Sequence, residues 1–322
     1  MATTKGYTGP SERVARQLAA TVITICTHRK RVRPSALATA VSLPFGSQDT
    51  VQSAWLDKLR TLPADVPASA LYAGRGFALA VQGATIAKAK LYILSAGLGL
   101  VAATQRVPGY GLTVSDGRAE SVTTRVTGEF DVDAWFSALL SGPYSKRWAD
   151  VGGHGSGRIL LALTRPYAEM VGRSLSELDL SILARLRIFG AALSPALPAV
   201  LRQALAPYDE RLDAILPGTR ADFAQRALLH FVSSIAVLRK AQDRASDYAA
   251  VEAALESAAA PDRPRRPRRT DEEILKLILV RLRSQSGIAR ILRALRDEEG
   301  VACEQSRFSR LYRAAVDQRT VA

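Results

Sequence analysis

Three short apolar runs constrain the fold of this chain more than any other feature of its sequence. They cover residues 21–26, 91–94 and 159–163, and each has the length and composition of a buried strand. Segments with helical spacing separate them. Strands that alternate with helices pair in parallel, because each helix returns the chain to the same end of the sheet. The sequence therefore predicts an α/β domain with a central, mostly parallel sheet flanked by helices.

The segments between these strands predict where the helices lie. Helical spacing covers residues 48–60, 70–89 and 130–142, and another helix is expected to open near Pro166. From residue 174 to about residue 259 the pattern is mostly helical. We therefore expect the second half of this domain to be a helical extension of the sheet.

Alternating Pro and Arg at residues 261–270 divide the chain. Such a run cannot pack into a core, so it predicts an extended, solvated linker between an α/β domain at 1–260 and a module at 271–322. The module is predicted to hold three short helices, at 271–283, 286–297 and 304–316. Its small core is expected to consist of Ile288, Ile291, Leu292, Leu295, Phe308 and Leu311. A tri-helical unit with a tight turn before its last helix resembles a helix-turn-helix.

The charge of the chain favours a polyanionic partner. Lys and Arg number 44 against 30 Asp and Glu, and residues 261–322 alone hold 15 basic and 9 acidic side chains. A general Arg-rich composition is the alternative for the whole chain, and a helical oligomerisation module is the alternative for its C-terminal part. If the module binds DNA, the expected contacts come from its linker and last helix: Arg265, Arg266, Arg268, Arg269, Gln305, Arg307 and Arg310.

Several classes of protein are disfavoured. The two cysteines, Cys26 and Cys303, and three histidines make neither a disulfide framework nor a metal-ligand spacing. No phosphate-binding loop or dinucleotide fingerprint occurs, and no apolar run is long enough to span a membrane. We therefore expect no metal, no cofactor and no membrane partner, and the cysteine content fits a reducing cytoplasm.

The ends of the predicted strands carry unusual residues. His28, Arg29 and Lys30 follow the first strand, whereas the second ends in Ser95–Gly97, where almost no side-chain bulk remains. Ligands of open parallel sheets bind beyond the carboxyl ends of the strands, so a phosphate or a base is expected to sit against this bare shelf. The alternative is a tight turn that requires positive φ at Gly97 or Gly99.

The order of these motifs resembles the YaaA-like superfamily over roughly the first 115 residues. The matching positions are Cys26, Lys30, Leu71, Tyr72, Tyr92, Ile93, Leu94, Ser95, Ala96, Gly99, Leu100, Tyr110, Leu112 and Thr113. One departure is that Gly111 stands where the family has Asp after Tyr, so a carboxylate role cannot be transferred to that position. The nearest acidic residue along the chain is Asp116.

The resemblance implies a DNA-directed α/β domain, because the superfamily is similar in fold to enzymes that handle nucleobases and is linked with DNA damage and phage conflict. A base that leaves the stack would enter a pocket formed by Ser95, Ala96, Gly97, Tyr110, Thr113 and Tyr167. Cleavage of its bond to the sugar requires a carboxylate near the sugar, but no metal.

Asp116 and Asp222 are the expected catalytic carboxylates. Asp222, Arg226 and His230 recur every four residues on one helix face, which could present an acid and a phosphate contact to DNA. The alternative is that Asp222 completes a capping box and pairs with Arg226 while His230 packs in the core.

These observations favour a DNA glycosylase-type enzyme that cleaves the N-glycosidic bond of a flipped modified or damaged base, in anti-phage defence or the DNA-damage response. The expected partner is double-stranded DNA, including modified phage DNA. RNA and the oligomeric state stay open. The alternatives are a non-enzymatic helix-turn-helix regulator and an enzyme that modifies tRNA or nucleoside bases.

Overall fold

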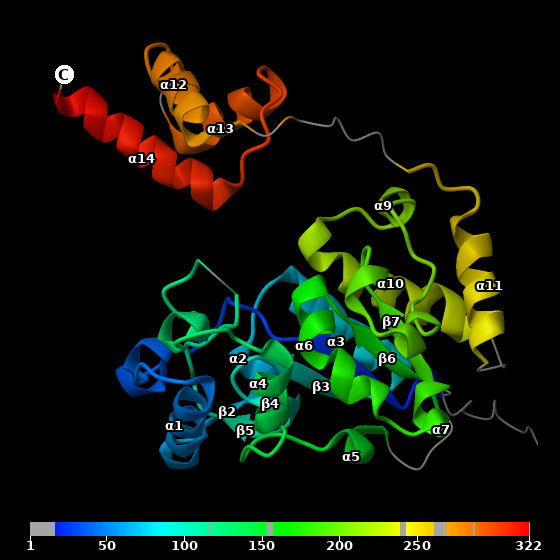
Figure 1. Cartoon of the computed structure of the whole chain (residues 1–322). Helices are drawn as coiled ribbons and strands as arrows, with labels where there is room; N and C mark the ends of the chain where they lie inside the picture. The colour runs from blue at the N-terminus through cyan, green and yellow to red at the C-terminus, as the bar shows by residue number, and fades with distance from the viewer. Residues whose placement is uncertain are drawn as a thin grey trace, which may run out of the picture. The chain divides into compact units, whose positions relative to one another are not determined.

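The computed structural model describes residues 17–115, 117–152, 157–238, 243–260, 267, 269–285 and 287–321 (Figure 1). The chain divides into two compact units, Met1–Ala260 and Pro261–Ala322. Most of the expected Pro-Arg linker, including Arg265, Arg266 and Arg268, lies outside the described residues.

A five-stranded sheet forms the centre of the first unit, in the order β4-β3-β1-β6-β7. Its strands are β1 (Thr21–Ile25), β3 (Lys90–Ser95), β4 (Gly99–Ala102), β6 (Ile159–Ala162) and β7 (Leu186–Phe189). β1 pairs in parallel with β3 and β6, β6 pairs in parallel with β7, and only β3 and β4 are antiparallel neighbours. The expected α/β class with a mostly parallel sheet is confirmed.

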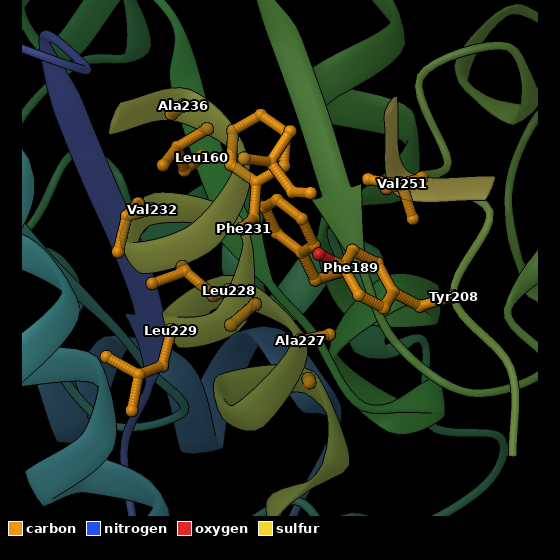
Figure 2. Close-up of a cluster of buried hydrophobic side chains, with 14 of the residues drawn as sticks. Leu160, Phe189, Tyr208, Ala227, Leu228, Leu229, Phe231, Val232, Ala236 and Val251 are labelled. Atoms are coloured by element: carbon orange, nitrogen blue, oxygen red, sulfur yellow. The ribbon is translucent and has the colours of Figure 1, made fainter. Parts of the chain in front are cut away.

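Helices cover both faces of this sheet. Alternate residues of a strand point to opposite faces, and Val22 and Leu160 pack in one apolar cluster while Ile23 and Leu161 pack in the other. The first cluster lies under α3 (Arg75–Ala87) and α10 (Phe223–His230), and the second under α4 (Val132–Leu139) and α6 (Arg165–Ser176). Figure 2 shows the first cluster, where Phe231 and Phe189 meet with ring centroids 5.3 Å apart.

The remaining elements are shorter or peripheral. The helices are α1 (Gln48–Thr61), α2 (Ala68–Leu71), α5 (Trp148–Gly152), α7 (Leu180–Leu183), α8 (Ala199–Arg202), α9 (Leu212–Ile215) and α11 (Arg244–Leu255), and β2 (Val66–Pro67) pairs with β5 (Arg106–Val107). The 3-10 turns are η1 (Ala36–Ala38), η2 (Ala40–Ser42), η3 (Val122–Arg125), η4 (Ser194–Ala196), η5 (Arg220–Asp222) and η7 (Ala236–Leu238), and η6 (Phe231–Ile235) is π-helical.

The structure differs from the sequence-based expectation at several stretches, including α2–α3, β4 and β7. The helix expected over 70–89 is split, because the chain leaves α2 at Tyr72 in extended conformation and turns at Gly74 with φ of +111° before α3 begins. β7 lies inside the stretch expected to be mostly helical. The sequence of β7 did not indicate a buried strand because it contains Arg187. That side chain is fully buried and pairs with Asp247, which is distant in the chain.

The second unit contains α12 (Asp271–Arg281), α13 (Ile288–Asp297) and α14 (Gln305–Val321), close to the expected ranges. A capping box begins α12, in which Thr270 accepts from Glu273 N–H and the Glu273 carboxylate accepts from Thr270 N–H. The expected core residues Ile291, Leu292, Leu295, Phe308 and Leu311 are buried. Ile288, also expected there, is instead 41% exposed at the start of α13.

Candidate functional site

The segments after β1 and β3 leave the sheet at one edge. The two strands run in the same direction with Ile25 beside Leu94, and Cys26 N–H donates to Leu94 O at 2.8 Å. Residues 27–30 and 96–97, which follow these two strands, are therefore neighbours at the carboxyl edge of the sheet, as expected.

Aromatic side chains of the protein fill the space beside the small residues that follow β3. Trp55 Nε1 donates to Gly97 O at 2.7 Å, and Trp135 Nε1 donates to Ala96 O at 2.9 Å. Gly99 adopts φ of +83°, which favours glycine. Ser95 and Ala96 are buried as well, so the expectation that a ligand rests directly on Ser95–Gly97 is wrong. The small residues provide space for packing and for a turn.

Gly97 is small because an aromatic ring lies directly against it. A Cβ at this position would lie 2.6 Å from Tyr110 Cε2. Gly97→Ala is therefore expected to lower the free energy of unfolding by about 1–3 kcal/mol through overpacking, measured by urea denaturation. As a control, Gly76→Ala on α3 meets its nearest atoms at 3.4 Å and is expected to be neutral or mildly stabilising. Equal effects of the two variants would contradict this account of Gly97.

A pocket of about 160 Å³ opens beside these packed aromatics. It is lined by His28, Lys30, Val32, Arg33, Pro34, Tyr110, Gly111, Leu112 and Glu120. Three of these residues, His28, Lys30 and Tyr110, were expected at a ligand site from the sequence. The pocket is thus made by the tail of β1 and the loop that contains Tyr110.

Lys30 is the half-buried cation of this pocket, which the exposed Arg33 also lines. Its Nζ lies 4.3 Å from the centroid of the Tyr110 ring, in cation–π geometry, and its backbone bridges to Tyr72. Burial lowers the pKa of Lys30 below its ordinary value, and the charges of Cys26 and Glu120 only partly oppose this shift. The ammonium is therefore a better proton donor than that of an exposed lysine.

Buried hydroxyl groups hold Tyr110 in place below Lys30. Tyr110 OH shares hydrogen bonds with Ser95 Oγ at 2.7 Å and with Tyr72 OH at 3.1 Å. Burial raises the pKa of both phenols well above the ordinary tyrosine value, so both remain neutral. Tyr167 OH shares a hydrogen bond with Cys26 Sγ at 2.9 Å, at the end of β1.

This network brings together five residues on which the family resemblance depends: Cys26, Lys30, Tyr72, Ser95 and Tyr110. They come from segments far apart in the chain and meet at one edge of the sheet. Tyr167 joins them through Cys26. Four residues that were expected to form a base pocket do not line it: Ser95, Ala96, Gly97 and Tyr167. Ser95 and Gly97 contact Tyr110, which does line it.

Glu120 is the pocket residue that sequence reasoning missed. It is half-buried, and its backbone is held by Thr113, whose N–H donates to Glu120 O at 2.9 Å. Thr113, which was expected to contact a base, thus positions this carboxylate instead of lining the pocket. The sequence offered one indication of this role, because Glu120 lies seven residues after Thr113, the last residue of the Tyr-Gly-Leu-Thr motif. Asp116, the carboxylate named from the sequence, lies outside the described residues.

Packing leaves little room for a side chain at Gly111. A Cβ at this position would lie 3.1 Å from Pro34 Cγ and 3.2 Å from Thr39 Cγ2. A side chain there would need both neighbours to move, because the loop of residues 34–39 packs against this backbone. The carboxylate of the pocket therefore comes from Glu120 and not from position 111.

Asp222 and Arg226 have structural roles. Arg226 is fully buried, and it donates from Nε to Asp222 Oδ1 at 2.8 Å and from Nη1 to Asp213 Oδ1 at 2.7 Å. Burial alone would raise the pKa of Asp222, but hydrogen bonds from Arg226 and the Thr219 N–H lower it below its usual value. The capping-box alternative is confirmed. The expectations that Asp222 is catalytic and that Arg226 binds a phosphate are wrong, because the two side chains are buried and bond to each other. Arg226 also bonds to Asp213.

His230 also belongs to the core, as its alternative reading stated. Its Nδ1 shares a hydrogen bond of 2.8 Å with Tyr208 OH, and both residues are buried. Burial lowers the pKa of His230 and favours the neutral ring. The four-residue spacing of Asp222, Arg226 and His230 therefore marks a face of α10 that points inward.

Three of the arginines that were predicted to contact DNA form ion pairs within the second unit. Arg307 Nη2 and Arg310 Nη2 each lie 2.7 Å from a carboxylate oxygen of Asp271, and Arg269 pairs with Glu273 at 3.2 Å. These exposed pairs are weak and can exchange for phosphate contacts. Gln305 is exposed and lines a groove of about 480 Å³ between α13 and α14, which also contains Arg293 and Arg296.

The described part of the chain contains no cluster of three or more side chains able to hold a metal ion. Among the helices of the described ranges, none combines the length and apolar character needed to cross a bilayer. Comparisons with family models, with curated proteins and with solved structures found no match to this chain.

Proposed function

We propose that this protein hydrolyses the N-glycosidic bond of a nucleobase in DNA, and that the pocket holding Lys30 and Glu120 is its active site. The observation that carries the proposal is the presence of a carboxylate and a partly buried ammonium in one pocket at the carboxyl edge of a parallel sheet. Bond cleavage creates positive charge on the sugar and negative charge on the leaving base. The two side chains have the charges needed to stabilise both.

Each group has a distinct role in this proposal. Lys30 donates a hydrogen bond to the base and stabilises the electron pair that it gains when the C–N bond breaks. Glu120 stabilises the cationic sugar and accepts a proton from the water whose oxygen bonds to the anomeric carbon. Tyr110 holds the ammonium in place because its hydroxyl is fixed by Ser95 and Tyr72.

The volume of the pocket favours a base with a single ring. A cavity of about 150 Å³ is known to accommodate benzene, and this pocket measures about 160 Å³. A pyrimidine is therefore the better fit, with substituents directed to the open side. Modified pyrimidines of phage DNA belong to this class.

DNA as the partner is supported by charge and by the family resemblance. Arg29, Arg31 and Arg33 are exposed near the pocket, and none forms an ion pair with another described residue. The residues that match the YaaA-like superfamily surround the same site. A nucleic acid supplies both the phosphates that such cations bind and the base that the pocket would receive.

A direct assay tests the proposal. Full-length protein is incubated with double-stranded oligonucleotides that carry unmodified, deaminated, hydroxymethylated or alkylated bases, and abasic sites are scored by alkaline cleavage and mass spectrometry of the released base. We expect abasic sites at one or more pyrimidine modifications. No abasic product from any duplex at enzyme excess would overturn the proposal.

A DNA-binding regulator is the second candidate, and the groove between α13 and α14 favours it. Arg293, Arg296 and Gln305 line this groove on a basic unit, an arrangement compatible with phosphate and base contacts. A Glu120→Gln variant separates the candidates, because a regulator keeps its full biological effect without the carboxylate. An RNA-modifying enzyme is distinguished by whether RNA competes with DNA for the protein.

A further inference from the structure

Three large apolar side chains are exposed on one short segment of the first unit. Leu37 is 67% exposed, Val41 54% and Phe45 70%, and we call these residues the apolar ridge. Single exposed apolar residues are ordinary on a protein surface, whereas three within nine positions are a local concentration that a binding partner could cover.

The apolar ridge is attached to the wall of the pocket. Ala40 N–H donates to Gly111 O at 2.9 Å, and Gly111 N–H donates to Ala38 O at 2.8 Å. Gly111 and Pro34 line the pocket, so η1 and η2 lie directly behind this wall. Leu37 follows Pro34 by three residues and is the ridge residue nearest to the pocket along the chain.

Backbone and side-chain contacts hold the ridge in one conformation. Ser42 Oγ donates to Leu37 O at 2.9 Å and to Thr39 O at 2.8 Å, which closes the two turns onto each other. Phe45 lies 4.4 Å from the Arg125 guanidinium, and the next residue, Gly46, donates from its N–H to Arg125 O. The backbone of the ridge and the Phe45 ring are therefore held in place by the protein itself.

The charges around the ridge indicate the chemistry of that partner. Residues 27–48 contain no Asp or Glu, while Arg29, Lys30, Arg31 and Arg33 precede the ridge. An apolar segment that follows the exposed cations Arg29, Arg31 and Arg33 along the chain fits a polyanion with an apolar interior. Double-stranded DNA has this character, because phosphates lie outside a stack of bases.

We propose that the apolar ridge inserts into the base stack of double-stranded DNA beside the pocket, with Leu37 taking the space of the base that the pocket receives. This inference rests on the proposed function, since it assigns the ridge to the same base. Apolar wedges that unstack a base step are a known means of opening a duplex, and an extruded base requires its former neighbours to be held apart. The ridge would supply that group, and the arginines would hold the phosphates.

Fluorescence of 2-aminopurine in a duplex tests the insertion without requiring catalysis, because this base brightens when it leaves the stack. Wild-type protein at saturating concentration is expected to raise the fluorescence of a duplex that carries 2-aminopurine next to the target pyrimidine. The double variant Leu37→Ala/Phe45→Ala is expected to lose most of this rise while its affinity at low salt changes by less than about threefold, because the phosphate contacts remain. Leu180→Ala on α7, a leucine that is 80% exposed and does not line the pocket, is the matched control and should behave as wild type.

The outcomes separate the ridge from the proposed function. If base release is also detected, the double variant should lose about tenfold in rate on duplex DNA and keep its rate on single strands, where no stack needs opening. If no base is released but the fluorescence rise depends on the ridge, the result supports the ridge proposal and contradicts the proposed hydrolysis of the N-glycosidic bond. A bound duplex without a fluorescence change would overturn the ridge proposal. So would a wild-type dimer that the double variant converts to monomers, because a second copy would then be the partner of the ridge.

Discussion

Asp247→Asn is expected to lower the free energy of unfolding by about 3–5 kcal/mol, the range for removal of one partner from a buried ion pair. Asp247 is fully buried and accepts from Arg158 Nε at 2.8 Å and Nη2 at 2.6 Å, and from Arg187 Nε at 2.8 Å. Arg158 precedes β6, Arg187 lies in β7, and Asp247 comes from α11. One carboxylate thus fastens this helix to two neighbouring parts of the sheet.

The physical reason is that two buried guanidinium groups share one carboxylate. Burial lowers the pKa of Arg187, and Asp247 opposes this shift, so the interior penalises the cation whenever the carboxylate is absent. Asparagine keeps the shape and the hydrogen-bonding oxygen but removes the charge. The variant therefore removes the negative charge that both guanidinium groups contact, in a site from which water is excluded.

Urea denaturation of three variants tests this account. Glu252→Gln, also on α11, removes a carboxylate that pairs with Arg211 at 2.9 Å on the surface, and it is expected to cost less than about 1 kcal/mol. Arg187→Met removes one of the two cations and leaves Arg158 paired with Asp247, so it should cost less than Asp247→Asn. If Asp247→Asn were no more destabilising than Glu252→Gln, the proposed role of this cluster would be wrong.

Glu120→Gln is expected to reduce the rate constant of base release by about 10²–10³, the range for loss of one preorganised charged or hydrogen-bonding group from an active site. This prediction rests on the proposed function. Affinity for DNA should change little, because phosphate contacts by the exposed arginines dominate binding. Single-turnover kinetics with excess enzyme measure the rate constant separately from binding.

Two further variants make the test specific. Glu129→Gln removes an exposed carboxylate that does not line the pocket, and it should retain the wild-type rate. Glu120→Asp keeps the charge with a shorter side chain and should restore part of the activity. A Glu120→Gln enzyme with an unchanged single-turnover rate would remove Glu120 from the mechanism.

The pH dependence of base release supplies an independent check on Lys30. If its protonated form is required, activity should fall as pH rises through the pKa of Lys30, which burial places below the ordinary lysine value of 10.5. Glu120 raises this pKa, so the residual activity of Glu120→Gln should fall at a lower pH than that of wild type. A shift of the basic limb to higher pH would contradict the arrangement of charges in the pocket.

Local sequence patterns were sufficient to predict the class of fold. The buried strands β1, β3 and β6 are short, mostly apolar runs, and such runs need no knowledge of distant residues to be recognised. β7 was missed because Arg187 interrupts its pattern, and a charged residue in a core strand depends on a partner elsewhere. That partner, Asp247, lies 60 residues further along the chain.

The candidate site was predictable in part, because some of its residues follow strands that local sequence patterns identify. The parallel pairing of β1 and β3 places Lys30 and the end of β3 at one edge, and strand order in the sequence already indicated this. The sequence could not show that Trp55, Trp135 and Tyr110 fill the space left by Gly97. It also could not show that Glu120 reaches the pocket, because a loop held at Thr113 directs it there.

The sequence by itself therefore determined the alternation of strands and helices, the division of the chain near residue 260 and the basic character of both units. Only the tertiary structure decided which polar groups are buried and which face an open pocket. Asp222 and Glu120 illustrate the difference, since one is enclosed by Arg226 and the other lines the pocket. Periodicity depends on neighbours along the chain, whereas burial depends on contacts between segments that are distant in it.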